Sequence, residues 1–326
     1  MIPFYERSIN IDAGNKCTLE CAACSRQRYR KLGKTIPGDD LTPKQFDKLT
    51  DYFKKVSFCG TFSDPIFNPH FIDILKICKK KNIKTEISSA ASQRPIKWYK
   101  RAFETYDKAK WVFGIDGLPK DSHKYRIHQN GEYLFDIMLM AKYQNIPVVW
   151  QYIVFDYNKD DLEEAKKLAK LHKIRMQIIF SNRNVDTFKV KSDEIKNIDD
   201  NQVEKIISKK ESNSKILYTS KNISSKKINK FNPKCLLTSR DLSFSNTGHI
   251  MPCCWLNTRY SEKGISNLFD NKHHIDNNTV EEIINSKDWK DFFNILKNNS
   301  ENAPFTCKSY CSNSIEDNPE ETKIKI

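Results

Sequence analysis

NKCTLECAAC, the stretch from residue 15 to residue 24, places three cysteines in a Cys-x3-Cys-x2-Cys run just after an alternating segment at residues 7–12. They are Cys17, Cys21 and Cys24. Three thiolates on one short loop can each bind one iron of a four-iron cluster, which leaves the fourth iron open for a reaction. A structural zinc knuckle and a thiol cluster without metal are the alternatives. A structural zinc site requires a fourth Cys or His ligand nearby, and the next histidine in the sequence is His70.

The composition indicates a globular protein. Of the 326 residues, 38% are apolar and 11% are aromatic, which is enough for a sizeable core. Residues 1–7 contain no long apolar run, and no stretch approaches the roughly 18 apolar residues of a membrane span. Ten cysteines without a secretory signal favour metal ligation over disulfides. We therefore expect a soluble, cytoplasmic protein with no membrane partner.

The formal net charge of +14 admits two kinds of partner. One is a nucleic acid, and the other is an acidic electron donor such as flavodoxin or ferredoxin that docks on a basic face. Lysine runs such as 76–84 and 221–230 are typical of solvated surface, and no basic stripe is interleaved with aromatic residues. General lysine abundance is the simplest explanation and donor docking is the next. We do not expect a nucleic-acid partner.

Strands and helices alternate over the first half of the chain. Period-two or fully apolar segments predict six strands, at residues 7–12, 56–59, 84–88, 111–115, 147–155 and 175–180. Amphipathic segments predict the helices between them, at residues 43–54, 71–80, 96–105, 131–143 and 160–172. This alternation is typical of parallel β/α units. A full eight-fold barrel needs about 250 residues, so we predict an α/β fold with a partial (β/α)6 barrel.

The second half carries four further cysteines around a predicted hairpin, namely Cys235, Cys253, Cys307 and Cys311. The hairpin spans residues 241–255 with a turn at 246–248, and helices are expected at 280–286 and 288–296. We predict four regions: a barrel at 1–181, a connecting segment at 182–234 with one helix near 202–208, a small α+β auxiliary domain at 235–315, and a loose polar tail at 316–326.

The two cysteine sets in this frame resemble the radical S-adenosylmethionine (SAM) superfamily and its SPASM/Twitch branch, over most of residues 7–312. In that family the open iron binds the amino and carboxylate groups of SAM. An electron from the cluster then cleaves SAM to a 5′-deoxyadenosyl radical, which abstracts hydrogen from the substrate. The resemblance implies SAM as a cofactor and a [4Fe–4S] cluster on Cys17, Cys21 and Cys24.

The resemblance also implies an auxiliary [4Fe–4S] cluster on the four later cysteines. Cys235-x17-Cys253, with Gly248 ahead of Cys253 in a Gly-x4-Cys spacing, matches the opening of the auxiliary domain. Zinc bound by the four thiolates is the alternative. The cysteines for a second auxiliary cluster are absent from the sequence, so we expect the Twitch type with one. Cys254 could replace its neighbour Cys253, but the spacing favours Cys253.

Further segments match the family more weakly. The turn CGTFSDP at 59–65 occupies the place of the Gly-Gly-Glu-Pro motif, where the backbone and an acidic side chain receive the SAM ammonium. GIDG at 114–117 resembles Ser-Ile-Asp-Gly, and an arginine of the family pairs with the SAM carboxylate. The SAM-binding residues implied by the resemblance are Gly60, Ser63, Asp64, Pro65, Ser88, Ser89, Gly114 and Arg126, with a weaker assignment for Tyr157 and Asn158. An ordinary surface position is the alternative for Arg126.

Several roles stay open at this point. Ala23 stands where many relatives carry an aromatic residue that packs on adenine, so the adenine contacts are unassigned. Cys78 fits an apolar helix face, and Cys59 lies beside the SAM turn without an assigned role. A catalytic base is not identified; the candidates near strand ends are Asp116, Glu86 and Asp64.

We predict a radical SAM enzyme that abstracts hydrogen from carbon of an unidentified substrate. An auxiliary cluster makes a net oxidation plausible, such as dehydrogenation or modification of a peptide or small molecule. The alternatives are a redox-neutral epimerase, decarboxylase or rearrangement, an RNA-modifying radical SAM enzyme, and a zinc-stapled scaffold without catalysis. The fold does not identify the substrate.

Overall fold

Six parallel strands form the centre of the molecule, as the alternating pattern predicts. The computed structural model describes residues 3–180, 231–237, 241–312 and 322–325. Each of the six strands pairs in parallel with the next. They are β1 (Ile9–Ile11), β2 (Lys55–Phe58), β3 (Lys84–Ser89), β4 (Lys110–Gly114), β5 (Val148–Val154) and β6 (Arg175–Phe180).

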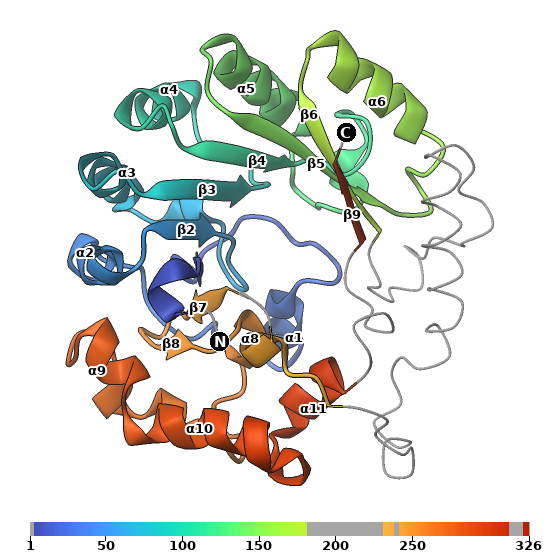
Figure 1. The fold of residues 1–326 in the computed structure, drawn as a ribbon. Helices are drawn as coiled ribbons and strands as arrows, with labels where there is room; N and C mark the ends of the chain where they lie inside the picture. The colour runs from blue at the N-terminus through green and yellow to red at the C-terminus, as the bar shows by residue number, and fades with distance from the viewer. Residues whose placement is uncertain (1–2, 181–230, 238–240, 313–321, 326) are drawn as a thin grey trace.

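Helices cover the outer face of the curved sheet (Figure 1). The predicted ones are α2 (Pro43–Tyr52), α3 (Phe71–Lys80), α4 (Ile96–Thr105), α5 (Gly131–Tyr143) and α6 (Leu162–Leu171). Helix α2 begins at a capping box, in which Thr42 and Gln45 satisfy each other's backbone N–H groups. Helix α1 (Ser25–Lys31) was not predicted, because it buries no residue and so has no amphipathic period. The predicted partial (β/α)6 barrel is confirmed.

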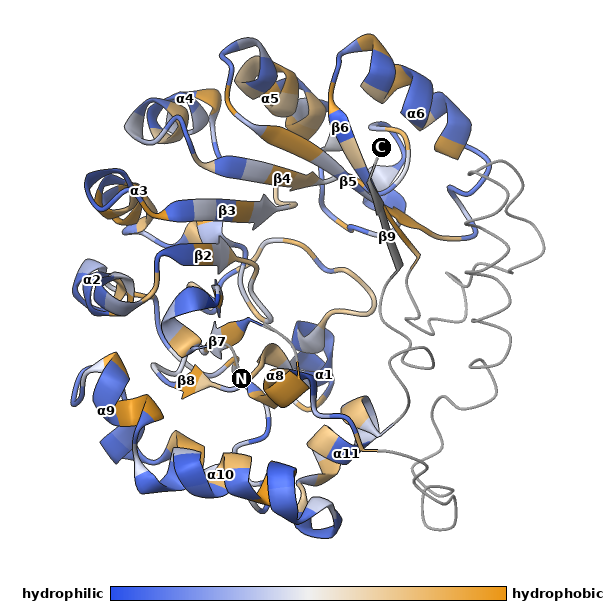
Figure 2. Cartoon of the chain, in the orientation of Figure 1, coloured by the Kyte–Doolittle hydropathy of each residue, from blue (hydrophilic) through white to orange (hydrophobic). Residues whose placement is uncertain are grey.

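Large aromatic side chains fill the space between the sheet and the helices. Trp111 of β4 packs against Phe103 of α4 with ring centroids 5.2 Å apart, and Trp150 of β5 packs against Phe135 of α5 at 5.2 Å. The helices are hydrophilic over much of their length, whereas the strands carry apolar segments (Figure 2). Among the described residues, no helix combines the length and apolar character needed to cross a membrane.

The predicted hairpin of the second half extends the barrel sheet. Strand β7 (Leu242–Phe244) pairs antiparallel with β8 (Ile250–Met251) and also pairs in parallel with β1. All of β7 and β8 is buried, which explains why the hairpin joins the sheet. The predicted helices are α9 (Val280–Ile284) and α10 (Lys287–Asn298), and two short helices were not predicted, α8 (Lys234–Leu237) and α11 (Phe305–Cys311).

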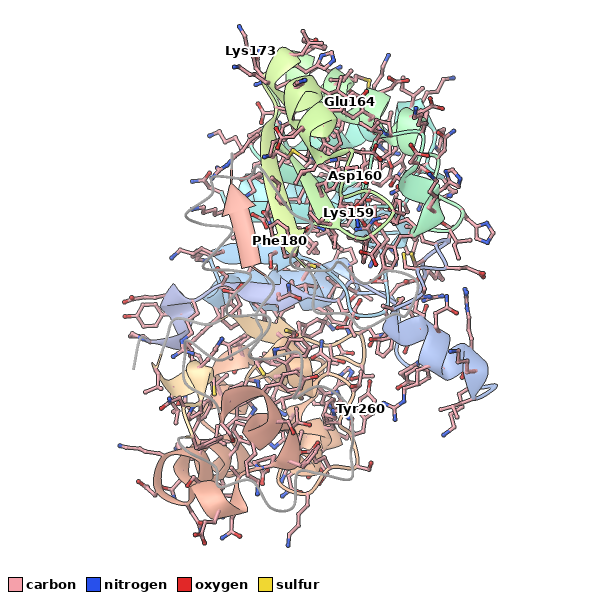
Figure 3. All side chains as sticks on the ribbon, turned by 90° about the vertical axis from the view of Figure 1, so that its right-hand side faces the viewer. Lys159, Asp160, Glu164, Lys173, Phe180 and Tyr260 are labelled. Carbon is pink, nitrogen blue, oxygen red and sulfur yellow. The ribbon has the colours of Figure 1, made fainter. Side chains whose placement is uncertain are left out.

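One part of the predicted tail is a strand. Strand β9 (Thr322–Lys325) pairs antiparallel with β6, opposite Phe180 and its neighbours, so a loose tail is wrong for these residues (Figure 3). The free edge of β6 offers unpaired backbone groups, and a short alternating segment can satisfy them. The sheet order is β8-β7-β1-β2-β3-β4-β5-β6-β9. Most of the predicted connecting segment, with its helix near 202–208, lies outside the described residues, and the four domain boundaries stay a prediction.

Candidate functional site

The three clustered cysteines lie on the loop between β1 and α1, at the carboxyl end of β1. Parallel barrels bind ligands at this end of their strands. Cys24 is the residue before α1, and its N–H donates to the carbonyl of Cys21 at 3.0 Å. All three side chains are partly buried. Burial raises the pKa of Cys17 to about 12, so its thiolate needs a positive partner.

Asp12 holds the 59–65 turn against this loop. Its carboxylate accepts hydrogen bonds from the N–H groups of Thr61 and Phe62 at 2.9 Å, and from the hydroxyl of Ser63 at 2.6 Å. A Cβ on Gly60 would lie 2.5 Å from Asp12 Oδ1, so only glycine fits there. Burial raises the pKa of Asp12 to about 6, and these hydrogen bonds oppose that rise. The sequence analysis missed Asp12, although an acid directly after β1 was its signal.

Two further contacts join the turn to the cysteine loop. Arg26 Nη1 donates to the carbonyl of Asn15 at 2.6 Å and to the carbonyl of Phe62 at 2.7 Å. The N–H of Asp64 donates to the carbonyl of Lys16 at 3.0 Å. The 59–65 turn and the cysteine loop therefore form one connected unit at the carboxyl end of β1 and β2.

The Asp64 side chain ties the turn to the end of β3. Its carboxylate accepts hydrogen bonds from the N–H groups of Ala90 and Ala91 at 2.8 and 3.0 Å, and from the Ser89 hydroxyl at 3.2 Å. Burial raises its pKa. Pro65 begins a short 3-10 helix, Pro65–Phe67. The hydrogen bonds of Asp64 and Ser89 therefore have a structural role. Ser88 is half-buried and lies on the opposite face of β3.

Arg126 and Asp116 form a buried ion pair beside the cysteine loop. Arg126 Nε lies 2.7 Å from Asp116 Oδ2, and the two side chains are 12% and 0% exposed, so an ordinary surface position for Arg126 is wrong. Burial lowers the pKa of Arg126, but the charges of Asp116 and Cys21 outweigh it and hold that pKa above its usual value. A Cβ on Gly114 would lie 2.9 Å from Arg126 Nη2, so glycine leaves the room that the guanidinium occupies.

A buried apolar patch also borders the loop. Its members are Tyr125, Ile153, Phe155 and Ile179, and the partly buried Cys21, Ala23 and Tyr157 pack against it. Tyr125 and Phe155 are in ring contact, with centroids 4.2 Å apart. Asn158 is buried and holds the end of β5, because its side chain bonds to the backbone of Ile153 and Phe155. These contacts give Asn158 a structural role.

The four later cysteines line one cavity, which we call the auxiliary cavity. Cys235 comes from α8, Cys253 follows β8, and Cys307 and Cys311 lie on α11. Burial raises the pKa of Cys307, and the three neighbouring thiols raise it further, because thiolates gathered in an apolar cavity repel one another. Such a donor set fits a group that supplies positive charge.

The other cysteines lie apart from both sets. Cys254 is exposed and is not part of the cavity lining, which agrees with the choice of Cys253. Cys78 is buried in the core as expected, and Cys59 is exposed. Among the described residues, no three His, Cys, Asp or Glu side chains converge on one point that a single metal ion could occupy. In a four-iron cluster each thiolate binds its own iron.

The three candidate bases are all engaged. Asp64 and Asp116 hold the contacts described above, and Asp116 Oδ1 also accepts a hydrogen bond from the N–H of Ile153 at 2.8 Å. Glu86 lies in the middle of β3, not at its end, and forms an ion pair with Lys110 at the start of β4. The structure therefore does not single out a base.

Asp12→Ala is expected to loosen the 59–65 turn without removing a cysteine. The variant leaves buried N–H groups without an acceptor, so the free energy of unfolding should fall by about 1–3 kcal/mol. Denaturant unfolding followed by circular dichroism measures this change. Asp39→Ala removes an exposed carboxylate and is the control. Unchanged stability in Asp12→Ala would show that Asp12 does not hold the 59–65 turn.

Solved structures show what this fold is similar to. Neither a family model nor a curated protein sequence matches the chain. Streptococcus suis SuiB bound to its precursor peptide SuiA is 14% identical with a TM-score of 0.59, over 92% of this chain and 70% of that chain. Native anSMEcpe with bound AdoMet is 14% identical with a TM-score of 0.57, over 89% and 83%. In the structure of SuiB alone, this chain matches only 66% of the length of the SuiB chain.

Both neighbours are radical SAM enzymes of the SPASM/Twitch branch. At this level of identity, the likeness shows the fold of the chain.

Proposed function

We propose that this chain, which has the fold of the SPASM/Twitch radical SAM enzymes, cleaves SAM reductively and abstracts hydrogen from a substrate. The observation that carries the proposal is the loop of Cys17, Cys21 and Cys24, three partly buried thiols at the carboxyl end of β1. The loop fits a four-iron cluster, because three thiolates leave one iron open. When bound, the cluster supplies the electron that cleaves SAM.

The buried ion pair supports a site for the SAM carboxylate. Asp116 engages Arg126 at Nε, 2.7 Å from Oδ2, and the guanidinium carries two further donor groups, at Nη1 and Nη2. Two Nη donors suit a carboxylate in a paired geometry. We assign this role to Arg126 and a positioning role to Asp116. The 59–65 turn, held by Asp12, then offers backbone carbonyls to the SAM ammonium.

Ser88 and the apolar patch complete the proposed SAM site. Ser88 is half-buried on the face of β3 opposite Ser89, so its hydroxyl is the one that we assign to the ribose. The patch of Tyr125, Ile153, Phe155 and Ile179 packs against Cys21 and Ala23. It supplies the apolar surface for adenine that Ala23 cannot provide alone.

Ile179→Ala is expected to weaken SAM binding about tenfold, because it removes apolar contact worth about 0.8 kcal/mol per methylene group. Ile178→Ala is the matched control, since the two residues are adjacent on β6 and their side chains belong to different clusters. Both variants should lose stability to a similar degree, about 2–5 kcal/mol. Equal SAM affinities of the two variants, measured by equilibrium dialysis, would exclude the patch as the adenine surface.

We also propose an auxiliary [4Fe–4S] cluster in the cavity of Cys235, Cys253, Cys307 and Cys311. The convergence of four thiols in one apolar cavity supports it, since four thiolates saturate such a cluster. Zinc is the alternative metal that four cysteine ligands could bind. A saturated cluster suits electron relay, so a net oxidation is the reaction that we favour over a redox-neutral one.

The substrate that we favour is a peptide. SuiB was solved with its precursor peptide and anSMEcpe with the Cp18Cys peptide, and the chain is similar in fold to both. A small-molecule substrate is the alternative. The partner that we propose is an acidic flavodoxin or ferredoxin. Helix α1 carries Arg26, Arg28, Arg30 and Lys31 directly after Cys24, which places positive charge beside the proposed cluster.

Metal analysis after anaerobic reconstitution tests the proposal. We expect about eight irons per chain, four for each cluster. Zinc in place of iron would contradict the enzyme hypothesis and favour a scaffold. About four irons per chain would mean a single cluster, and iron that persists in Cys17→Ala/Cys21→Ala/Cys24→Ala would place that cluster in the auxiliary cavity.

A further inference from the structure

Arg7 connects the beginning of the chain to the auxiliary cavity. It lies just before β1 and is only 1% exposed. Its Nη1 atom donates a hydrogen bond to the carbonyl of Cys235 at 2.9 Å, across 228 residues of sequence. Its guanidinium also lies over the ring of Phe4, 5.0 Å from the ring centroid. Phe4 in turn contacts the buried Trp289 of α10, with ring centroids 5.9 Å apart.

The hydrogen bond to the Cys235 carbonyl holds the guanidinium beside a residue that lines the auxiliary cavity. Arginine stays protonated at every pH at which proteins are folded, so its positive charge is permanent. A buried charge is screened far less by salt and water than an exposed one. Arg7 therefore brings a fixed positive charge and a fixed hydrogen bond to one wall of the auxiliary cavity.

We propose that Arg7 raises the reduction potential of the auxiliary cluster. This inference rests on the auxiliary cluster of the proposed function. Net charge, hydrogen bonds and exposure set the potential of an iron–sulfur cluster. Reduction adds one negative charge to a group that four thiolates already make anionic, so a nearby cation stabilises the reduced form more than the oxidised form. Arg7 acts through Cys235 and is a positioning residue that favours electron acceptance.

The test measures the potential of the auxiliary cluster alone. Each variant is made in a Cys17→Ala/Cys21→Ala/Cys24→Ala background, which retains only the four later thiols as cluster ligands. Two neutral replacements, Arg7→Gln and Arg7→Met, remove the charge, and Arg7→Lys keeps it. Arg94→Gln is the matched control, because Arg94 also lies over aromatic rings and donates to a backbone carbonyl, that of Ile66.

In a redox titration followed by electron paramagnetic resonance, we expect each neutral variant to shift the reduction equilibrium about tenfold toward the oxidised form. For one electron this is about 59 mV. Arg7→Lys should keep most of the wild-type potential, and Arg94→Gln should not change it. An unchanged potential in a neutral variant with intact iron content would overturn the proposal.

Loss of the cluster is informative as well. If both neutral variants lose their iron while Arg7→Lys retains it, the result supports a requirement for the charge. If Arg7→Lys loses its iron too, Arg7 has a packing role and the proposal is overturned. A triple-alanine background that holds zinc or no metal contradicts the auxiliary cluster itself, which separates a failure of the proposed function from a failure of the role of Arg7.

Discussion

Replacing Cys17, Cys21 and Cys24 by alanine is expected to abolish the cleavage of SAM, with 5′-deoxyadenosine falling to the level of a protein-free control. In the proposed function these three thiolates are the ligands of the open cluster. Iron should fall from about eight to about four per chain, because the auxiliary cavity keeps its four cysteines. Chromatographic quantification of 5′-deoxyadenosine under dithionite, with parallel iron analysis, checks both numbers.

Two exposed cysteines provide matched controls. Cys59→Ala removes an exposed thiol, and Cys254→Ala removes the neighbour of Cys253, but neither belongs to a proposed ligand set. Both variants should keep about eight irons and full SAM cleavage. If the triple-alanine protein still made 5′-deoxyadenosine, the loop would not be the site of cleavage.

Arg126→Gln is expected to give the second largest effect, on both stability and SAM binding. It leaves the fully buried carboxylate of Asp116 without its cation, which lowers the free energy of unfolding by about 3–5 kcal/mol. In the proposed site it also removes charge-assisted hydrogen bonds to the SAM carboxylate, worth about 1.5–3 kcal/mol each, so SAM affinity should fall about tenfold to a hundredfold. Denaturant unfolding and calorimetry measure the two effects.

A double variant separates the two roles of Arg126. Asp116→Asn/Arg126→Gln has no uncompensated charge and should recover most of the stability, but it should not recover SAM affinity. Lys124, two residues before Arg126, forms a partly exposed ion pair with Asp121, and Lys124→Gln should change stability by less than about 1 kcal/mol. A double variant that regained full SAM affinity would show that Arg126 does not bind the ligand.

Local sequence patterns predicted most of the fold. Helices α3, α4 and α5 and strand β6 have the predicted bounds, because a regular apolar period marks α3 and α4 and a continuous apolar segment marks α5 and β6. Two features depend on pairing between distant segments, namely the parallel contact of β7 with β1 and the addition of β9 to β6. No local period encodes such a pairing, so the sequence could not predict it.

The candidate site also has features that the sequence predicts and features that depend on tertiary contacts. Cysteine spacing indicated two sets of candidate ligands, whose metal binding stays a prediction, and the structure brings the four later cysteines into one cavity. Asp12 and Arg7 escaped the sequence analysis because their roles come from contacts with the 59–65 turn and with Cys235. Asp64 was expected to face SAM, yet its carboxylate bonds to the backbone after β3. Such side-chain directions follow from tertiary packing.

The most direct test of the account uses the wild-type protein, reconstituted anaerobically with iron and sulfide and then incubated with SAM and dithionite. The account predicts that 5′-deoxyadenosine and methionine form together in equal amounts. It also predicts that the signal of the reduced cluster in electron paramagnetic resonance changes when SAM is added, because SAM binds the open iron. A protein that holds its iron but gives neither product nor spectral change would contradict the assignment of the cysteine loop.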